Sequence, residues 1–379
     1  MRWKQRDVVE VLIDARPLRG GTGIARYTNT IIAGLPAYDR TKSYKTFGWR
    51  SQIGEHRENL PAQVTSILPG RALAAFARAG LAAPRWGIGN ASIFHGTSFD
   101  IPNIRGLRTI ATLYDLIFMC VPDAYPPTSI DGLVAGVRRA AKSATLVATV
   151  SHNSKADLIE YFKFDPDRVR VLYPPVVDGN GTSLYLHSDT EAHRVESEIP
   201  YLLVVGTVTP HKNLIRIIDA FALVSRHVDH QLVVVGSHEN QSYSKLVKDH
   251  ACSVLPEGRV KFTGMVNDQN LSSLYDGADA LVMCSLYEGF GYPVAEAASR
   301  GIPVITSNVS SLPEVAGAGA LLVDPRSTEE IADALHRVIV DSELRAALIQ
   351  AGRTEVMRFT VERFFHSIVE MYGDLESRM

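Results

Sequence analysis

Short apolar runs alternate with helical patterns along the whole chain. In the first half these runs predict strands at 8–13, 44–49, 92–95, 109–113, 146–150 and 169–172. The segments between them carry the periodicity of amphipathic helices, for example 24–35, 129–142 and 155–162. Regular alternation of strand and helix is typical of parallel sheets covered by helices. The pattern therefore predicts the α/β fold class.

A second series of strands begins after a polar stretch at 174–200. Its apolar runs lie at 201–205, 232–235, 260–262, 280–284, 304–306 and 321–323. We predict a Rossmann-like domain at 1–180, a linker at 181–200, and a second Rossmann-like domain at 201–358. The apolar stripe of 359–379 predicts a last helix that packs back on the first domain. Two doubly wound domains joined in this way face each other across a cleft at the carboxyl ends of their strands.

Bulk composition agrees with a globular protein of two domains. The chain has 379 residues, of which 46% are hydrophobic and 21% are charged. No apolar run reaches the roughly 18 residues that would span a bilayer. The beginning of the chain has no apolar segment typical of a secretory signal, and three distant cysteines fit a reducing compartment. We therefore expect a cytoplasmic location.

Charge is distributed unevenly between the two halves. Residues 1–180 carry 23 Lys and Arg against 15 Asp and Glu, whereas residues 181–379 carry 16 against 26. The first half is thus net +8 and the second net −10, which predicts that the first half meets an anionic partner. No aromatic and basic platform for nucleic acid is present, so no nucleic acid is expected. A membrane surface or a phosphorylated acceptor fits better.

The segment from Tyr287 to Asp324 carries the strongest chemical signal. Glu288 and Glu296 flank a turn that contains Gly289, Phe290, Gly291, Tyr292 and Pro293, in a strand–turn–helix pattern. Backbone N–H groups in such a turn and the start of the helix form an anion site. Glu288 should lie in the turn, and Glu296 about two turns into the helix. Two acids beside a phosphate site suit a sugar nucleotide, because each carboxylate can accept hydrogen bonds from vicinal hydroxyls.

Three further segments at predicted strand ends carry candidate residues. Gly23 belongs to a glycine-rich loop that either faces a ligand or forms a plain turn, and its spacing is not that of a dinucleotide fingerprint. Thr207, His211 and Lys212 follow the first strand of the second domain, where Lys212 either neutralises a diphosphate or is a solvated cap. Tyr114 and Asp115 end a strand of the first domain, and Asp115 either orients Tyr114 or a backbone amide, or belongs to an ordinary turn.

Two other motifs have simpler interpretations. Asp165-Pro-Asp167 has the form of a metal-binding motif, but between a helix and a strand it is ordinary turn chemistry. The spacing of Arg71 and Arg78 predicts that they share one face of a small apolar helix, which would either contact an anionic membrane or pack on its own sheet.

These segments resemble the retaining family-four glycosyltransferases of the GT-B fold. The resemblance rests on Glu288 to Glu296, Gly206 to Asn213, Val266 to Tyr275 and Ser311 to Asp324. It covers most of the chain and is most specific over about 200–330. The segment from Gly206 to Asn213 is similar to the bacterial mannosyltransferase branch of O-antigen and exopolysaccharide synthesis.

The resemblance implies a role for each site residue. The second domain would bind the nucleotide-sugar donor, with Glu296 on the ribose hydroxyls, and the first domain would bind the acceptor. Lys212 would contact the diphosphate, Val266 the base, and Gly23 would line the phosphate side of the cleft. Glu288 and the amides of Phe290 and Gly291 would hold the donor sugar and the phosphates.

The chain departs from the family pattern at two positions. Members often carry Arg where this chain has Thr207, so the diphosphate charge must be met by Lys212, His211 and backbone amides. Members also commonly carry His where this chain has Tyr114. That His contacts the donor sugar, so the corresponding contact is open here.

We therefore expect a hexosyltransferase, with mannose from GDP-mannose as the favoured donor, that acts with retention and without a metal or other cofactor. Lys212 and the helix start would supply the positive charge. The acceptor would be a saccharide, with a lipid-linked oligosaccharide at the inner face of the membrane favoured. UDP-glucose or another donor, a sugar-nucleotide epimerase, and a non-catalytic binding protein are the alternatives.

Overall fold

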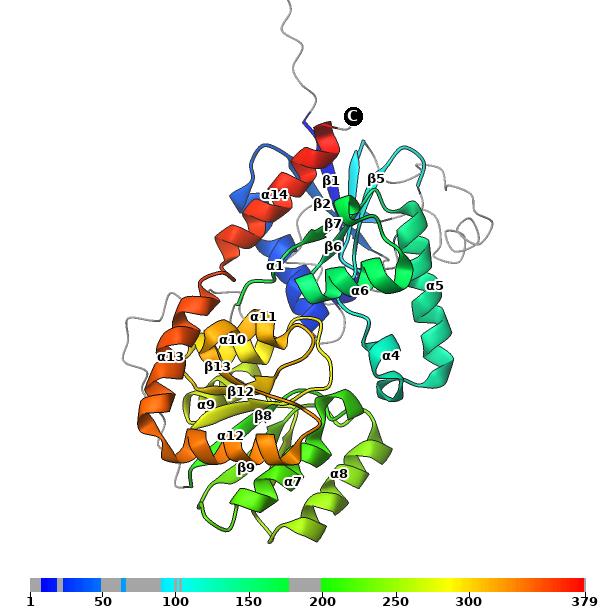
Figure 1. The fold of residues 1–379 in the computed structure, drawn as a ribbon. Coiled ribbons are helices and arrows are strands. Elements are labelled where there is room, and N and C mark those ends of the chain that lie inside the picture. Colours follow the sequence, from blue (N-terminus) through cyan, green and yellow to red (C-terminus); the bar gives the residue numbers. More distant parts are fainter. Residues whose placement is uncertain are drawn as a thin grey trace, which may run out of the picture.

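Two α/β domains stand one above the other in the computed structural model (Figure 1). The structure describes residues 8–18, 23–48, 63–65, 90–98, 101, 104–176 and 199–377, with only the backbone at 63–65. The predicted linker at 181–200 and the predicted helix with Arg71 and Arg78 thus lie largely or wholly outside the described residues.

The first domain is built on a parallel sheet of seven strands in the order β3-β2-β1-β4-β5-β6-β7. β1 and β4 at its centre are buried almost throughout, as expected for strands covered on both faces. The strands are β1 (Glu10–Asp14), β2 (Ser43–Gly48), β3 (Gln63–Thr65), β4 (Ile93–Gly96), β5 (Arg108–Thr112), β6 (Leu146–Thr149) and β7 (Val169–Val171).

The helices of the first domain follow its strands. They are α1 (Gly23–Tyr38), α4 (Ile117–Cys120), α5 (Pro127–Ser143) and α6 (His152–Phe162), with the 3-10 helices η1 (Arg16–Leu18), η3 (Pro122–Ala124) and η4 (Pro166–Arg168). α6 begins where the Ser151 side chain accepts a hydrogen bond from the Ser154 amide, which satisfies a backbone donor at the helix start. α1 follows the carboxyl end of β1, so its first turn faces the second domain.

The second domain contains a parallel sheet of six strands in the order β10-β9-β8-β11-β12-β13. Their apolar runs were predicted almost residue for residue. The strands are β8 (Tyr201–Val205), β9 (Gln231–Val235), β10 (Val260–Gly264), β11 (Ala280–Met283), β12 (Val304–Ser307) and β13 (Ala320–Val323).

Four helices of the second domain, α8, α9, α12 and α13, begin at polar side-chain caps. Asn240, Asn267, Ser327 and Asp341 each accept a hydrogen bond from a backbone amide three residues on. The helices are α7 (Leu214–Val224), α8 (Gln241–Val254), α9 (Asp268–Asp276), α10 (Tyr292–Ser299), α11 (Leu312–Ala316), α12 (Thr328–Val340) and α13 (Ser342–Val356), with the 3-10 helices η6 (Pro210–Lys212) and η7 (Gly317–Gly319).

Two details differ from the sequence predictions. β3 was not predicted, because its three residues carry no apolar run that marks a strand. Glu296 lies one turn into α10 rather than two, since the helix begins at Tyr292 and 3.6 residues make a turn.

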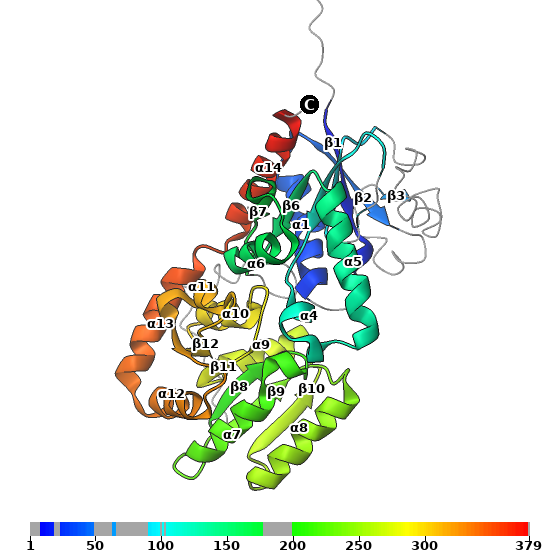
Figure 2. The ribbon, with the colours of Figure 1, turned by 45° about the vertical axis from the view of Figure 1, so that its right-hand side comes forward.

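The last helix, α14 (Val361–Ser377), leaves the second domain and runs along the first (Figure 2). Its Phe364 ring packs edge-on against Tyr27 of α1, with centroids 5.1 Å apart. Near its end, Arg108 of β5 donates a hydrogen bond of 2.7 Å to the Leu375 carbonyl. The helix therefore ties the carboxyl end of the described chain to the first domain.

One hydrophobic cluster runs through both domains. It includes Ile13 and Ile31 of the first domain, Leu281 and Phe290 of the second, and Tyr372 of α14. Because apolar burial is the main stabilising contribution to folding, this shared cluster holds the cleft walls together. Within the described part of the chain, no helix is both long and apolar enough to cross a bilayer.

A buried histidine lies where α14 meets the first sheet. His95 of β4 is fully buried, and its Nδ1 lies 2.7 Å from the hydroxyl of Tyr372. Burial lowers the pKa of His95 to about 3, from 6.5 in an unfolded chain. Between these two pH values the His95 ring is protonated in the unfolded chain and neutral in the folded chain. The free energy of unfolding therefore falls as the pH drops from 6.5 toward 3.

We predict that His95→Asn, which keeps a polar side chain without a titrating ring, flattens this pH dependence. Between pH 6.5 and 5 the wild-type chain should lose about 2 kcal/mol more unfolding free energy than the variant. Urea denaturation at a series of pH values measures both. Equal slopes for the two chains would contradict the assignment.

Candidate active site

A cleft of about 1270 Å³ lies between the domains, at the carboxyl ends of the central strands. The first domain contributes residues of α1 and the end of β5, and the second contributes the ends of β8 and β9 and the turn into α10. Its charged and hydroxyl-bearing lining residues, among those described, include Arg26, Tyr114, Asp115, Thr207, Lys212, Ser237, Glu239, Asp268, Glu288, Tyr292 and Glu296.

Lys212 and Glu288 form an ion pair in the lining of this cleft. The Lys212 Nζ donates to the Glu288 Oε1 at 2.6 Å, and the two side chains are 14% and 10% exposed. Gly206 makes room for the lysine, because a Cβ there would lie 2.8 Å from the Lys212 Cε. The sequence placed both residues in one site, and the structure adds that they contact each other.

The pKa of Glu288 lies below its ordinary value although burial opposes its ionisation. The positive charge of Lys212 is the largest contribution that opposes this burial, and its hydrogen bond adds to the effect. Burial also lowers the pKa of His211 to about 4. His211 is therefore neutral at pH 7, and Lys212 provides the positive charge beside Glu288.

The turn after Glu288 brings the second domain against the first. Gly289 needs the absence of a side chain, since a Cβ would lie 2.7 Å from the Tyr114 carbonyl oxygen. Gly291 has φ of 98°, in the left-handed region that favours glycine, and α10 begins directly after it. The Tyr292 ring lies against Gly23 of α1, where a Cβ would be 3.3 Å from it.

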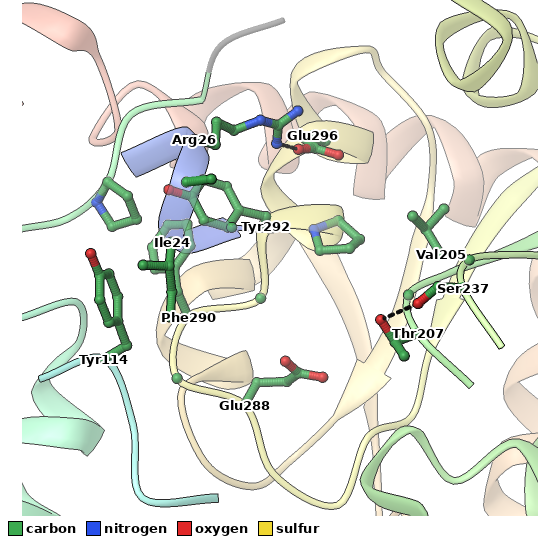
Figure 3. Close-up of a pocket in the computed structure, with 18 of the residues that line it drawn as sticks. Ile24, Arg26, Tyr114, Val205, Thr207, Ser237, Glu288, Phe290, Tyr292 and Glu296 are labelled. Atoms are coloured by element: carbon green, nitrogen blue, oxygen red, sulfur yellow. Dashed lines mark hydrogen bonds and ion pairs between the residues drawn. The ribbon is translucent and has the colours of Figure 1, made fainter. Parts of the chain in front are cut away.

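Glu296 is held by residues of both domains. Arg26 of α1 donates from its Nη1 to the Glu296 Oε1, across 270 positions of the sequence (Figure 3). Tyr275 at the end of α9 donates to the other carboxylate oxygen at 2.8 Å. The Arg26 guanidinium also lies over the Tyr292 ring, 5.5 Å from its centroid.

Sequence reasoning missed both partners of Glu296. Arg26 belongs to the glycine-rich loop and helix start that were singled out for Gly23, three positions later. The sequence did contain one signal for Arg26: it is a cation in the first turn of a helix whose start was predicted to face a ligand. Tyr275 ends one of the segments that carry the resemblance, but a buried tyrosine on an amphipathic helix is an ordinary core residue, so its contact with Glu296 was not predicted.

Tyr114 and Asp115 meet the turn into α10 from the opposite wall. The Tyr114 hydroxyl donates to the Thr97 carbonyl at 2.9 Å, so this side chain is anchored in its own domain. Asp115 accepts a hydrogen bond of 3.1 Å from the Ile117 amide two residues on, which is the ordinary turn among the alternatives left open by the sequence. Burial raises the pKa of Asp115 to about 6, and the nearby Glu288 charge adds to the shift.

A second group of contacts joins the domains beside the cleft. The Glu314 carboxylate of α11 accepts hydrogen bonds from the amides of His152 and Asn153 at 2.8 and 3.2 Å, so it caps α6 of the other domain. It also accepts a bond of 2.7 Å from the Tyr173 hydroxyl. The Tyr287 hydroxyl donates to Asp157 of α6. None of these pairs was predicted.

The remaining predicted donor-site residues also line the cleft. Gly23, His211, Val266, Gly289, Phe290 and Gly291 are all among its lining residues. Thr207 accepts a hydrogen bond of 3.2 Å from Ser237, as Figure 3 shows. Arg71 and Arg78, the predicted membrane or acceptor surface, lie outside the described residues.

No metal cluster is found among the described residues, where no group of three or more His, Cys, Asp or Glu side chains could hold an ion. Asp165-Pro-Asp167 is a turn, as the sequence indicated. The Asp165 Oδ1 accepts a hydrogen bond of 3.0 Å from the Asp167 amide and thereby caps η4.

The family described as "Glycosyl transferases group 1" matches residues 188–355. This segment contains Lys212, Glu288 and Glu296, so the match covers the second-domain wall of the cleft.

Two curated bacterial proteins are similar over most of the chain. The O-antigen chain mannosyltransferase B of Escherichia coli is 28% identical over 295 residues, which cover 74% of each chain. The O-antigen chain mannosyltransferase RfbU of Salmonella typhimurium is 27% identical, over 66% of this chain and 68% of its own. Other curated relatives are matched over smaller shares of their length, from 28% to 58%.

Among solved structures, HepE from Anabaena in complex with UDP and glucose has a TM-score of 0.71 and 17% identity. The superposition covers 96% of this chain and 99% of HepE. The two chains therefore share a fold.

We predict that Asp115→Asn stabilises the protein at high pH. The raised pKa of Asp115 means that ionisation is disfavoured in the folded state, so the aspartate lowers stability above pH 6 and not below about 4. Asn keeps an acceptor for the Ile117 amide. At pH 8 the variant should gain about 1 kcal/mol or more of unfolding free energy, and at pH 4 this gain should vanish.

Thermal and urea unfolding at pH 4, 6 and 8 test this expectation, with Asp131→Asn on the exposed face of α5 as the control. A difference between Asp115→Asn and wild type that is the same at all three pH values would contradict a raised pKa.

Proposed function

Because this chain is a glycosyltransferase of the GT-B fold with a group 1 domain in its second half, we propose that it transfers mannose from GDP-mannose to a saccharide hydroxyl, with retention at the anomeric carbon. The observation that carries the proposal is the meeting of Lys212, Glu288 and the start of α10 in one cleft. A cation, a carboxylate and free helix amides suit the diphosphate and the hydroxyls of a nucleotide-sugar.

Different residues of the second-domain wall take different parts of the donor. Lys212 and the amides of Phe290 and Gly291 bind the diphosphate. The arginine that members of the family often carry is replaced here by Thr207. Glu288 accepts hydrogen bonds from the sugar hydroxyls, and Glu296 accepts them from the ribose. Val266 packs against the base. These roles rest on the resemblance of the sequence and on the places of these residues along the cleft.

We favour guanine as the base because of two further carboxylates in the lining of the cleft. Asp268 and Glu239 line it together with Val266. The Watson–Crick edge of guanine carries two donors, N1–H and N2–H, which one carboxylate can accept together, whereas uracil carries a single N–H donor there. The two relatives named as mannosyltransferases support mannose as the transferred sugar. HepE, solved with UDP and glucose, supports UDP-glucose as the second candidate.

In the reaction we infer, the bond between the anomeric carbon and the β-phosphate oxygen breaks as the acceptor oxygen bonds to the same face. The electron pair of the broken bond passes to the diphosphate, whose oxygen takes the acceptor proton. Lys212 and the start of α10 stabilise the charge that develops on the leaving group, so the proposal needs no metal. Glu288 and Glu296 lie eight positions apart on one wall, which does not suit two carboxyls on opposite sides of a glycosidic bond.

The acceptor we propose is a lipid-linked saccharide at the inner face of a membrane. The net charge of +8 on residues 1–180 supports a pyrophosphate-bearing or membrane-bound acceptor on that side. The two relatives named for O-antigen chains support a saccharide acceptor.

We predict that Glu288→Ala lowers kcat about 100-fold or more while the fold is retained, because it removes a contact to the reacting sugar. Mass spectrometry of products, with GDP-mannose and extracted lipid-linked saccharides, measures turnover. Glu257→Ala, at an exposed position, is the control. Turnover by Glu288→Ala at the wild-type rate would exclude Glu288 from the mechanism.

We also predict which donor is used and which residue selects it. GDP should appear from GDP-mannose, and little UDP from UDP-glucose, in the presence of acceptor. Asp268→Asn should weaken GDP binding by about tenfold and leave UDP binding unchanged, since it removes a charged acceptor for the guanine edge. Calorimetric titration measures both affinities. Turnover of UDP-glucose alone would overturn the mannose donor, and conversion of a donor to its isomer without acceptor would indicate an epimerase.

A further inference from the structure

Arg26 reaches across the cleft from the first domain to the second. It lies in the first turn of α1, and its guanidinium pairs with Glu296 of α10 and lies over the Tyr292 ring (Figure 3). The Glu296 side chain is 6% exposed, whereas that of Arg26 is 28% exposed toward the cleft. The arginine is thus the more accessible member of the pair.

The cleft holds an excess of negative charge. Five carboxylates line it, from Asp115, Glu239, Asp268, Glu288 and Glu296. Among the described lining residues, the two full positive charges are Arg26 and Lys212, since burial keeps His211 neutral. A donor diphosphate brings about two further negative charges. Lys212 alone cannot balance these, because Glu288 already contacts it at 2.6 Å.

Both cations are paired with the carboxylates that the donor would use. Lys212 pairs with Glu288, and Arg26 pairs with Glu296. A nucleotide-sugar presents the complementary groups, phosphate oxygens for the cations and hydroxyls for the carboxylates. The ribose hydroxyls and the α-phosphate belong to one nucleotide and lie a few ångströms apart. If Glu296 binds the ribose, the side chain of Arg26 beside it can therefore reach the α-phosphate. Exchange of partners would give each member of the two ion pairs a ligand group of complementary charge or hydrogen-bonding type.

We propose that Arg26 is a donor-binding residue that contributes a second phosphate contact from the opposite domain. Arg26 thereby supplies the second positive charge that the family's usual arginine would provide at the position of Thr207. The planar guanidinium suits two phosphate oxygens at once, and Tyr292 supports its flat face. This inference rests on the proposed function, since it assumes that the ligand is a nucleoside diphosphate sugar.

The position of Arg26 has a consequence for the two domains. Without donor, the Arg26–Glu296 pair bridges α1 and α10 directly. With donor, the bridge runs from Arg26 through the phosphate and ribose to Glu296. The first domain therefore contacts the donor before any acceptor is present, and donor affinity depends on a residue outside the segment matched by the family.

Three ligands separate a phosphate contact from a structural role. Wild type, Arg26→Met and Arg26→Lys are titrated calorimetrically with GDP, GMP and guanosine. Arg26→Met should weaken GDP and GMP roughly tenfold or more, which is the loss expected for one charge-assisted contact. Guanosine should bind as tightly as to wild type, or more tightly, because Glu296 is released. Arg26→Lys should recover part of the phosphate-dependent affinity.

Arg170→Met is the matched control, because Arg170 also pairs with a carboxylate, Asp374, at 3.1 Å and lies away from the lining of the cleft. It should bind all three ligands like wild type. Equal weakening of all three ligands by Arg26→Met would overturn the proposal, since the arginine would then act only by orienting Glu296 or holding the domains. Unchanged GDP affinity would overturn it as well.

Failure of the proposed function gives a different result. If wild type binds UDP, UMP and uridine instead of the guanine series, the same comparison is made with those ligands and only the base assignment fails. If wild type binds neither nucleoside diphosphate, the proposed function itself is overturned, and the proposal for Arg26 with it.

Discussion

The cleft depends on charges that are buried in pairs. An isolated ion costs several kcal/mol to bury, and the partner offsets that cost only at close range. Lys212 and Glu288 meet this condition within one domain, and Arg26 and Glu296 meet it across two. Each pair keeps a cation and an acceptor at the cleft surface, ready for a ligand that carries phosphates and hydroxyls. The same constraint explains why Glu288 stays ionised despite its burial.

The architecture places these pairs through the ends of parallel strands. β8 and β11 lie at the centre of the second sheet, and the turns that follow them carry Lys212 and Glu288. α1 follows β1 in the same way and directs Arg26 at the second domain. Glu314, which caps α6, and the shared apolar cluster fix the position of one domain relative to the other. Packing beside the cleft therefore fixes the distance between its two walls.

The sequence predicts the fold closely because buried parallel strands are short apolar runs with no alternation. The bounds of β8 were predicted without error, and those of β12 to one residue. β3 lacked this signal. Glu288, Lys212 and Asp115 were found because each follows a strand end, where ligands bind in such sheets. Pairs such as Arg26 with Glu296, or Glu314 with α6, join residues more than 160 positions apart, and no local pattern reveals them.

A crystal structure of the protein with GDP-mannose bound would show which ligand groups replace the two ion pairs. We expect the diphosphate to lie within hydrogen-bond distance of the Lys212 Nζ and the Arg26 guanidinium, while Glu296 accepts hydrogen bonds from the ribose. A donor bound elsewhere, or bound in this cleft with both ion pairs intact, would contradict it.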